Sequence, residues 1–194
     1  MQRTVIIECL NNIDQIVKLK GFVQVVRSHG KIAFLDLRDR SGVIQVGGFS
    51  PEVVASMSTL ASQDIIQITG KIKKREERYI NKALPTGTIE IEATEVVVLA
   101  KSSEMPFDMG GKDLNLELPT LLDYRSLTLR FPKIQKIFKI QAAIAEEFRK
   151  AARELDCTEI FVPTIAAGAT EGGAEVFKVN YYGHEAFMTQ SPQL

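Results

Sequence analysis

The sequence has no tryptophan and only two cysteines in 194 residues, and its 24 Lys and Arg residues balance 24 Asp and Glu residues. Cys9 and Cys157 lie far apart and form no Cys-x-x-Cys spacing, so neither a disulfide framework nor a cysteine metal site is expected. A net charge of zero predicts no global field that attracts nucleic acid. Any contact with RNA therefore needs a local patch of suitable side chains.

Long apolar runs are also missing. No stretch approaches the roughly 20 residues that a membrane helix needs, and the first residues, with an acid at Glu8, contain no apolar signal-peptide core. We therefore expect a cytoplasmic protein with no membrane partner. His29 and His184 have no ligand spacing and no partner cysteines, so no metal site is predicted.

The first half of the sequence has the periodicity of β-strands. Alternating or short apolar runs predict strands at 17–25, 32–38, 43–46, 64–73 and 88–99, with turn-rich clusters at Ser28–Lys31 and Asp39–Gly42. A short helix fits Pro51–Leu60, because proline suits the first helical turn. Three strands, a short helix and two strands are the order of an OB-fold, a five-stranded barrel that often binds oligonucleotides or oligosaccharides.

The second half of the sequence lacks the strand periodicity of the first half. Lys101–Leu118 lacks sustained periodicity and contains Pro106 and a Gly-Gly pair, which indicates a connector at a domain boundary. Apolar residues at helical spacing then predict a helix over Pro132–Leu155. The apolar run Glu159–Ile165 predicts a short strand, which Pro163 places at an edge or an end of a sheet.

Three residues of the predicted barrel are suited to single-stranded RNA. Phe34 offers a ring for stacking, while Arg27 and Gln45 offer polar groups to the backbone and to base edges. Composition alone favours the alternative in which Phe34 is part of the core and the arginines are solvated. The basic residues Lys71, Lys73, Lys74 and Arg75 are followed by two glutamates. They fit a solvated loop between strands, or a contact with phosphates.

The segments Val17–Gln24, Arg27–Lys31 and Phe34–Val46 together resemble the anticodon-binding domain of class II aspartyl- and asparaginyl-tRNA synthetases. The resemblance implies that Phe34 stacks on an anticodon base and that Gln45 reads the middle base. It further implies that Arg27 supports the anticodon backbone and that Glu90 helps to read the first anticodon base.

The second half resembles the catalytic domain of the same family. Leu122–Arg130 is similar to its opening segment, and the helix from Lys133 with the strand through Pro163 is similar to motif one, which forms the dimer interface. The loop Ala169–Ala174 resembles the lid over bound aspartate. The resemblance therefore implies that Glu171 and Gln193 bind the amino acid.

The expected fold is α+β: an OB-fold anticodon-binding domain over 1–104, a hinge over 105–130, and the first part of a class II antiparallel catalytic domain over 131–194. The resemblance favours the archaeal or eukaryotic branch of aspartyl-tRNA synthetases. It implies that the full-length parent is a homodimer that activates L-aspartate with ATP and Mg²⁺ and transfers it to tRNA.

Motifs two and three are not among the 194 residues, so no catalytic residue is visible and the chain alone is expected to be inactive. Two alternatives stay open. One is an asparaginyl or non-discriminating aspartyl synthetase, and the other is a free-standing OB-fold module that binds RNA without chemistry.

Overall fold

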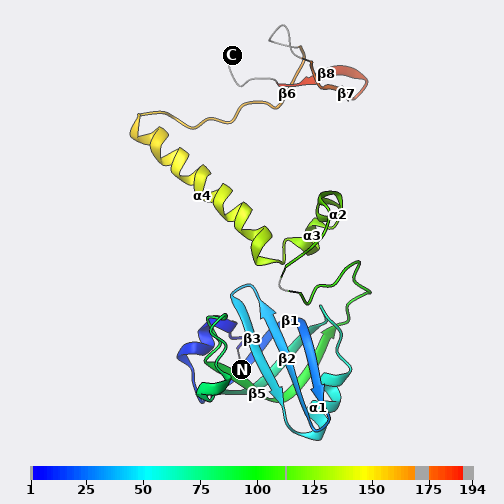
Figure 1. Ribbon diagram of the computed structural model, residues 1–194. Coiled ribbons are helices and arrows are strands. Elements are labelled where there is room, and N and C mark those ends of the chain that lie inside the picture. Colours follow the sequence, from blue (N-terminus) through cyan, green and yellow to red (C-terminus); the bar gives the residue numbers. More distant parts are fainter. Residues whose placement is uncertain (1, 112, 169–174, 190–194) are drawn as a thin grey trace. The chain divides into compact units, whose positions relative to one another are not determined.

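The computed structural model describes residues 2–111, 113–168 and 175–189. The chain divides into two compact units, Met1–Leu114 and Asn115–Leu194. In the first unit, five strands form a closed barrel in the order β1-β2-β3-β5-β4 (Figure 1). The strands are β1 (Ile16–His29), β2 (Ile32–Asp39), β3 (Gly42–Gly48), β4 (Ile65–Lys74) and β5 (Ile89–Ala100).

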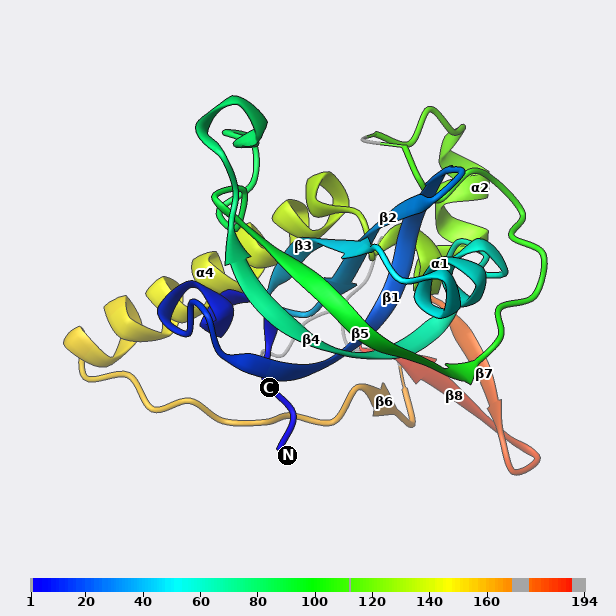
Figure 2. The same cartoon turned by 90° about the horizontal axis from the view of Figure 1, so that it is seen from below.

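The connections of the barrel confirm the predicted OB-fold. β1 pairs antiparallel with both β2 and β4, and β4 pairs antiparallel with β5, beside which it runs in Figure 2. β3 and β5 pair in parallel and close the barrel. The short helix α1 (Pro51–Ser58) lies between β3 and β4 in sequence, with proline in its first turn, and the Ser50 hydroxyl accepts a hydrogen bond from the amide of Val53.

The barrel interior is built largely by alternation of buried and outward residues along the strands. In β2 the buried positions are Ala33, Leu35, Leu37 and Asp39, with the intervening residues on the outside. The 3-10 helix η1 (Ile6–Asn11) adds Ile6 and Cys9, both fully buried, to the same core. Burial, with nearby Asp39 and Glu8, raises the pKa of the Cys9 thiol to about 11, so this cysteine is a core residue and a poor nucleophile.

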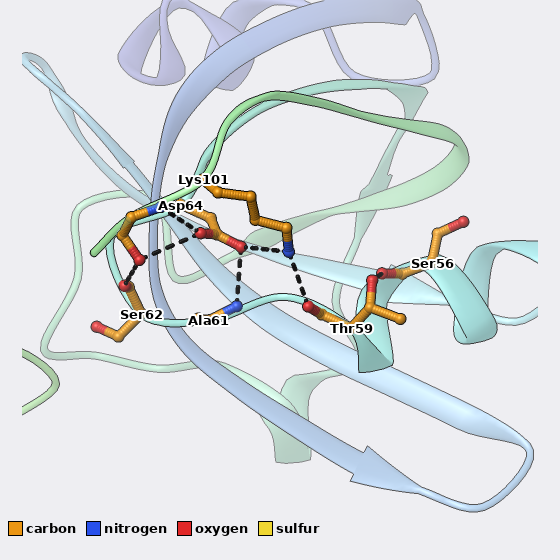
Figure 3. Close-up of polar contacts among 7 residues, drawn as sticks. Ser56, Thr59, Ala61, Ser62, Asp64 and Lys101 are labelled. Atoms are coloured by element: carbon orange, nitrogen blue, oxygen red, sulfur yellow. Dashed lines mark hydrogen bonds and ion pairs between the residues drawn. The ribbon is translucent and has the colours of Figure 1, made fainter. Parts of the chain in front are cut away.

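A buried carboxylate ties the end of β5 to the loop before β4 (Figure 3). Asp64, whose side chain is fully buried, accepts hydrogen bonds from the amides of Ala61 (2.9 Å) and Ser102 (2.8 Å) and from Nζ of Lys101 (2.9 Å). Nζ of Lys101 also donates to the carbonyl of Thr59 at 2.9 Å. Burial opposes the charged form, but these hydrogen bonds outweigh it and hold the pKa of Asp64 below its ordinary value.

The described residues of the second unit form three helices and a small sheet. The helices are α2 (Leu118–Asp123), α3 (Arg125–Thr128) and α4 (Pro132–Glu154). The sheet has the order β6-β8-β7, from β6 (Ile165–Ala166), β7 (Lys178–Tyr181) and β8 (His184–Met188). Tyr182 and Gly183 both have positive φ, the conformation of a type I′ turn, and this tight turn joins β7 to β8.

Most predicted elements are confirmed, including the helix from Pro132 and the irregular connector after Ala100. The predicted turn at Ser28–Lys31 is too wide, because β1 continues to His29 and only Gly30 and Lys31 form the turn. The predicted strand over Glu159–Ile165 is wrong except at its last residue. A strand needs a partner to share its hydrogen bonds, and among the described residues from 159 to 166 only Ile165 and Ala166 pair, with β8. The domain limits at 104 and 130 stay predictions.

Candidate nucleic-acid interface

Strand register brings the predicted barrel residues together on one outer face. Arg27 of β1 is the pairing partner of Phe34 of β2. The next outward residue of β2, Asp36, pairs with Gln45 of β3, and Gln45 pairs with Glu90 of β5. Because side chains alternate across a strand, these residues lie outside the barrel while their sequence neighbours fill the core.

A groove of about 610 Å³ opens over this face. Its lining includes all four residues predicted for RNA contact, which are Arg27, Phe34, Gln45 and Glu90. It also includes Ile32, Phe49, Lys73, Lys74, Arg75, Glu76, Tyr79 and Glu92. The fold therefore gathers residues from all five strands of the barrel and from two loops into one concave surface.

Phe34 lies on the groove side of β2 rather than in the core. It is half-buried, whereas its neighbours Ala33 and Leu35 are fully buried inside the barrel. The ring of Phe49 packs edge-on against that of Phe34, with 6.0 Å between ring centroids and 85° between ring planes. The sequence-based alternative that made Phe34 a core residue is therefore wrong.

Gln45 and Glu90 form a polar pair in the groove. The Nε2 amide of Gln45 donates to Oε2 of Glu90 at 3.0 Å, and this bond sets which way the Gln45 amide points. Nε of Arg75 lies 3.8 Å from the same carboxylate oxygen, and the Arg75 side chain is only 12% exposed. Together these groups offer donors and acceptors of the kind that recognise the edge of an unstacked base.

Arg27 is held by an ion pair with two hydrogen bonds. Its Nη1 and Nη2 donate to the two carboxylate oxygens of Asp36 at 3.0 and 2.9 Å. The hydrogen bonds from the guanidinium to Asp36 raise the pKa of Arg27, so the Arg27 side chain stays positively charged. The bidentate geometry fixes the plane of the guanidinium, and its remaining N–H groups are directed away from Asp36.

Most of the basic segment belongs to a strand rather than to the loop that its charge pattern suggested, and only Arg75 lies in the loop after the strand. Lys71, Lys73 and Lys74 lie in β4, and alternation with the buried Ile72 turns Lys71 and Lys73 outward. Nζ of Lys73 lies 2.6 Å from Oε2 of Glu92, and this hydrogen bond raises the pKa of Lys73. Lys73, Lys74 and Arg75 line the groove together with the acidic residues Glu76, Glu90 and Glu92.

Sequence reasoning missed two aromatic residues of the groove. Phe49 follows β3, and Tyr79 belongs to the 3-10 helix η2 (Glu77–Tyr79) in the loop between β4 and β5. Both side chains are about half exposed, at 46% and 54%. Exposed rings next to Arg and Lys are a signal for nucleic-acid contact. Only the barrel closure, however, places these two loops beside Phe34.

The second unit presents an apolar helix face. No residue of α4 is buried in the described part of the chain, and Ile137, Ile144 and Phe148 are among its exposed apolar residues. A second groove, of about 800 Å³, runs between this face and the segment through Ile160. Pro163 lies exposed in the irregular segment that follows.

Two predicted site residues, Glu171 and Gln193, lie outside the described residues. Within residues 2–111, 113–168 and 175–189, no three His, Cys, Asp or Glu side chains gather closely enough to hold a metal ion. None of the helices in these ranges has the length and apolar character needed to cross a membrane.

Two family models match the chain. Residues 17–99 match an OB-fold nucleic acid binding domain, and residues 117–194 match the class II tRNA synthetases (D, K and N). An aspartate–tRNA(Asp/Asn) ligase from Haloquadratum walsbyi is 42% identical over 183 residues, which are 92% of this chain and 40% of the relative. One of the same name from Haloferax volcanii is 39% identical with the same coverage.

Solved structures share the fold. An asparaginyl-tRNA synthetase from Pyrococcus horikoshii aligns with 100% of this chain and 44% of its own, at 26% identity and a TM-score of 0.81. An aspartyl-tRNA synthetase from Entamoeba histolytica aligns with 84% of this chain and 40% of its own, at 24% identity and a TM-score of 0.72, which supports the fold alone. The chain spans about 40% of the length of the curated relatives it matches. With an OB-fold barrel followed by a class II segment, the chain belongs to the class II tRNA synthetases of the D, K and N group.

Proposed function

We propose that the barrel binds the anticodon loop of a tRNA in the groove around Phe34. One unstacked base lies on the Phe34 ring, and Gln45 and Glu90 contact the edges of neighbouring bases. Arg27, fixed by Asp36, supports the RNA backbone. The observation that carries this proposal is the convergence of these side chains, from four different strands, on one groove of about 610 Å³.

The charge of the groove fits a loop of single-stranded RNA better than a duplex. Lys73, Lys74 and Arg75 stand at one side for phosphates, while Glu90 and Glu92 stand among them. Carboxylates repel phosphates but accept hydrogen bonds from base amino groups, so the mixture favours reading of bases over tight charge-driven binding. With a net charge of zero for the chain, we expect modest affinity that depends on the correct bases.

For the protein as a whole, we propose an aspartate–tRNA ligase that activates L-aspartate with ATP and Mg²⁺ and transfers it to tRNA. The names of the relatives, aspartate–tRNA(Asp/Asn) ligases, support this and favour relaxed tRNA specificity over the asparaginyl alternative. The class II match beyond the barrel argues against a free-standing RNA-binding module. ATP and Mg²⁺ follow from the family, and we assign neither to a described residue.

Two further roles belong to this proposal. Glu171 and Gln193 bind the substrate aspartate, as the family resemblance implies. The exposed apolar face of α4 and the segment at Pro163 form the interface of a homodimer. The exposure of Ile144 (64%) and Phe148 (75%) supports a partner surface, because large apolar side chains gain free energy when they leave water.

Binding of anticodon stem-loop RNAs by the 194-residue chain tests the barrel's role. Phe34→Ala is expected to weaken binding of the tRNA(Asp) stem-loop by about 1–3 kcal/mol, the usual contribution of one stacked base. Leu99→Ala, at a half-exposed position of β5 outside the groove, is the matched control and should bind like the wild type. Equal affinities of wild type and Phe34→Ala would contradict the proposal.

Relaxed specificity predicts similar affinities for the tRNA(Asp) and tRNA(Asn) stem-loops, and a large preference for one of them would contradict relaxed specificity.

A further inference from the structure

The residue opposite Phe34 in the β2–β3 ladder has no side chain. Phe34 pairs with Gly47, and directly paired residues on one face of a sheet normally fill the space beside each other. At this place the space is taken by a different residue. The Phe49 ring lies there, edge-on to Phe34 at a centroid distance of 6.0 Å.

A methyl group at position 47 would collide with both rings. An added Cβ would lie 2.8 Å from Cε2 and 2.9 Å from Cζ of Phe49, and 3.3 Å from Cε1 of Phe34. The first two distances are shorter than carbon contacts allow, so the Phe49 ring would have to move. The third requires a shift of a few tenths of an ångström by Phe34, the proposed stacking platform.

Backbone conformation does not demand glycine at position 47. Among the described glycines only Gly30 and Gly183 have positive φ, so the backbone of Gly47 suits an L-residue. What the glycine provides is room for the rings. The position of Phe49 is set independently, because it lies between the end of β3 and Ser50, the N-cap of α1.

We propose that Gly47 is a positioning residue for RNA binding, and that it acts by admitting the Phe49 ring as an edge-on support for Phe34. The inference rests on the proposed function, since it concerns the same groove. Phe49 restricts the tilt of the Phe34 ring, so that the ring is oriented before a base arrives. A platform held in one orientation loses less conformational entropy on binding than a mobile one. Gly47 therefore contributes to affinity without touching the RNA.

The test measures binding of the tRNA(Asp) anticodon stem-loop to the full 194-residue chain. Gly47→Ala is expected to weaken binding about three- to tenfold, the range that corresponds to one aromatic pair. Phe49→Ala should weaken it by a similar factor. The matched control is Gly42→Ala in the same strand, where the added Cβ meets only Cγ2 of Ile6 at an ordinary 3.8 Å, and it should leave affinity unchanged.

A double-mutant cycle separates positioning from a general loss of structure. Once Phe49 is alanine, the space beside Gly47 is empty, so Gly47→Ala should have little further effect on affinity. In the free protein, NMR should detect contacts between the Phe34 and Phe49 rings in the wild type and Gly42→Ala, and should lose them in Gly47→Ala. Additive effects of Gly47→Ala and Phe49→Ala, or unchanged ring contacts in Gly47→Ala, overturn the inference.

The two proposals fail in different ways. If Phe34→Ala binds the stem-loop as well as the wild type, the proposed function fails. If Phe34→Ala weakens binding while Gly47→Ala and Phe49→Ala do not, the proposed function stands and the positioning role of Gly47 is refuted.

Discussion

Gln45 and Glu90 are directly paired across the parallel strands β3 and β5, and the Gln45 amide donates to the Glu90 carboxylate at 3.0 Å. The two residues are 45 positions apart in sequence. Because an amide can present either its oxygen or its nitrogen to a ligand, the carboxylate decides which atom of Gln45 remains for a base. In the proposed complex with the anticodon loop, we therefore expect Glu90 to act on recognition through Gln45 as well as by its own contacts.

Glu90→Gln should reduce discrimination between anticodons more than affinity itself. The variant loses the charge-assisted bond that orients Gln45, and the preference for the correct middle base should fall by about 1–2 kcal/mol. The measurement is the ratio of dissociation constants for the tRNA(Asp) stem-loop and one with an altered middle base. Glu95→Gln is the control, since Glu95 accepts from Thr69 and does not line the groove. An unchanged ratio in Glu90→Gln would contradict the orienting role.

Asp64 should make the barrel sensitive to acid. Its folded-state pKa is lowered, so its stabilising contribution is present above the unfolded-state pKa and is lost as pH falls through the folded-state value. Asp64→Asn should lower the free energy of unfolding by about 2–3 kcal/mol at pH 7, because several hydrogen bonds to a buried charge are lost. The difference from wild type should stay constant above about pH 5 and shrink below about pH 4.

Urea unfolding at a series of pH values measures this difference. Asp14→Asn is the matched control, because Asp14 also pairs with a lysine, Lys71 at 3.2 Å, but its side chain is 74% exposed. An exposed pair contributes little, so this variant should differ from wild type by less than about 1 kcal/mol. A pH-independent effect of Asp64→Asn would show that its charge does not stabilise the fold.

Residues 1–114 should fold cooperatively by themselves. Every member of the barrel's core cluster lies between Ile6 and Ala93, and Met109, only 4% exposed, is buried in the same unit. A shorter chain of residues 1–103 lacks Met109 and should be less stable by about 1–3 kcal/mol, the contribution of one buried methionine. Thermal unfolding followed by circular dichroism compares the two. A broad, non-cooperative transition of residues 1–114 would refute the prediction.

The apolar face of α4 should drive self-association. Ile144→Gln combined with Phe148→Gln keeps side chains suited to a helix and removes two large exposed apolar groups. We expect the wild-type chain to sediment as a larger species than this variant, since each covered side chain favours association by about 1.5–3 kcal/mol. Lys139→Gln, on a polar position of the same helix, should behave like the wild type. Identical sedimentation of all three proteins would show that this face has no role in association.

Alternating or short apolar runs predicted five strands and their order, and Pro51 indicated the short helix between the third and fourth strands. Alternation with a period of two places the apolar residues on one face of a strand, so neighbouring residues in the sequence already indicate which face is buried. The helix from Pro132 was likewise predictable from the sequence, because its apolar spacing and its first-turn proline are local signals. The strand through Phe161 was predicted wrongly, because the same apolar residues that favour a strand do not supply a partner to pair with.

The sequence predicted only some of the residues that line the groove. The motif around Phe34 indicated Arg27, Phe34 and Gln45, and the resemblance added Glu90. The contacts of Phe34 with Phe49, and of Glu90 with Arg75, join residues from different strands and loops, so only closure of the barrel decides them. The same is true of Gly47, which in sequence is one of two adjacent glycines at a strand end. Its importance follows from cross-strand register, a property of the folded barrel that sequence spacing does not contain.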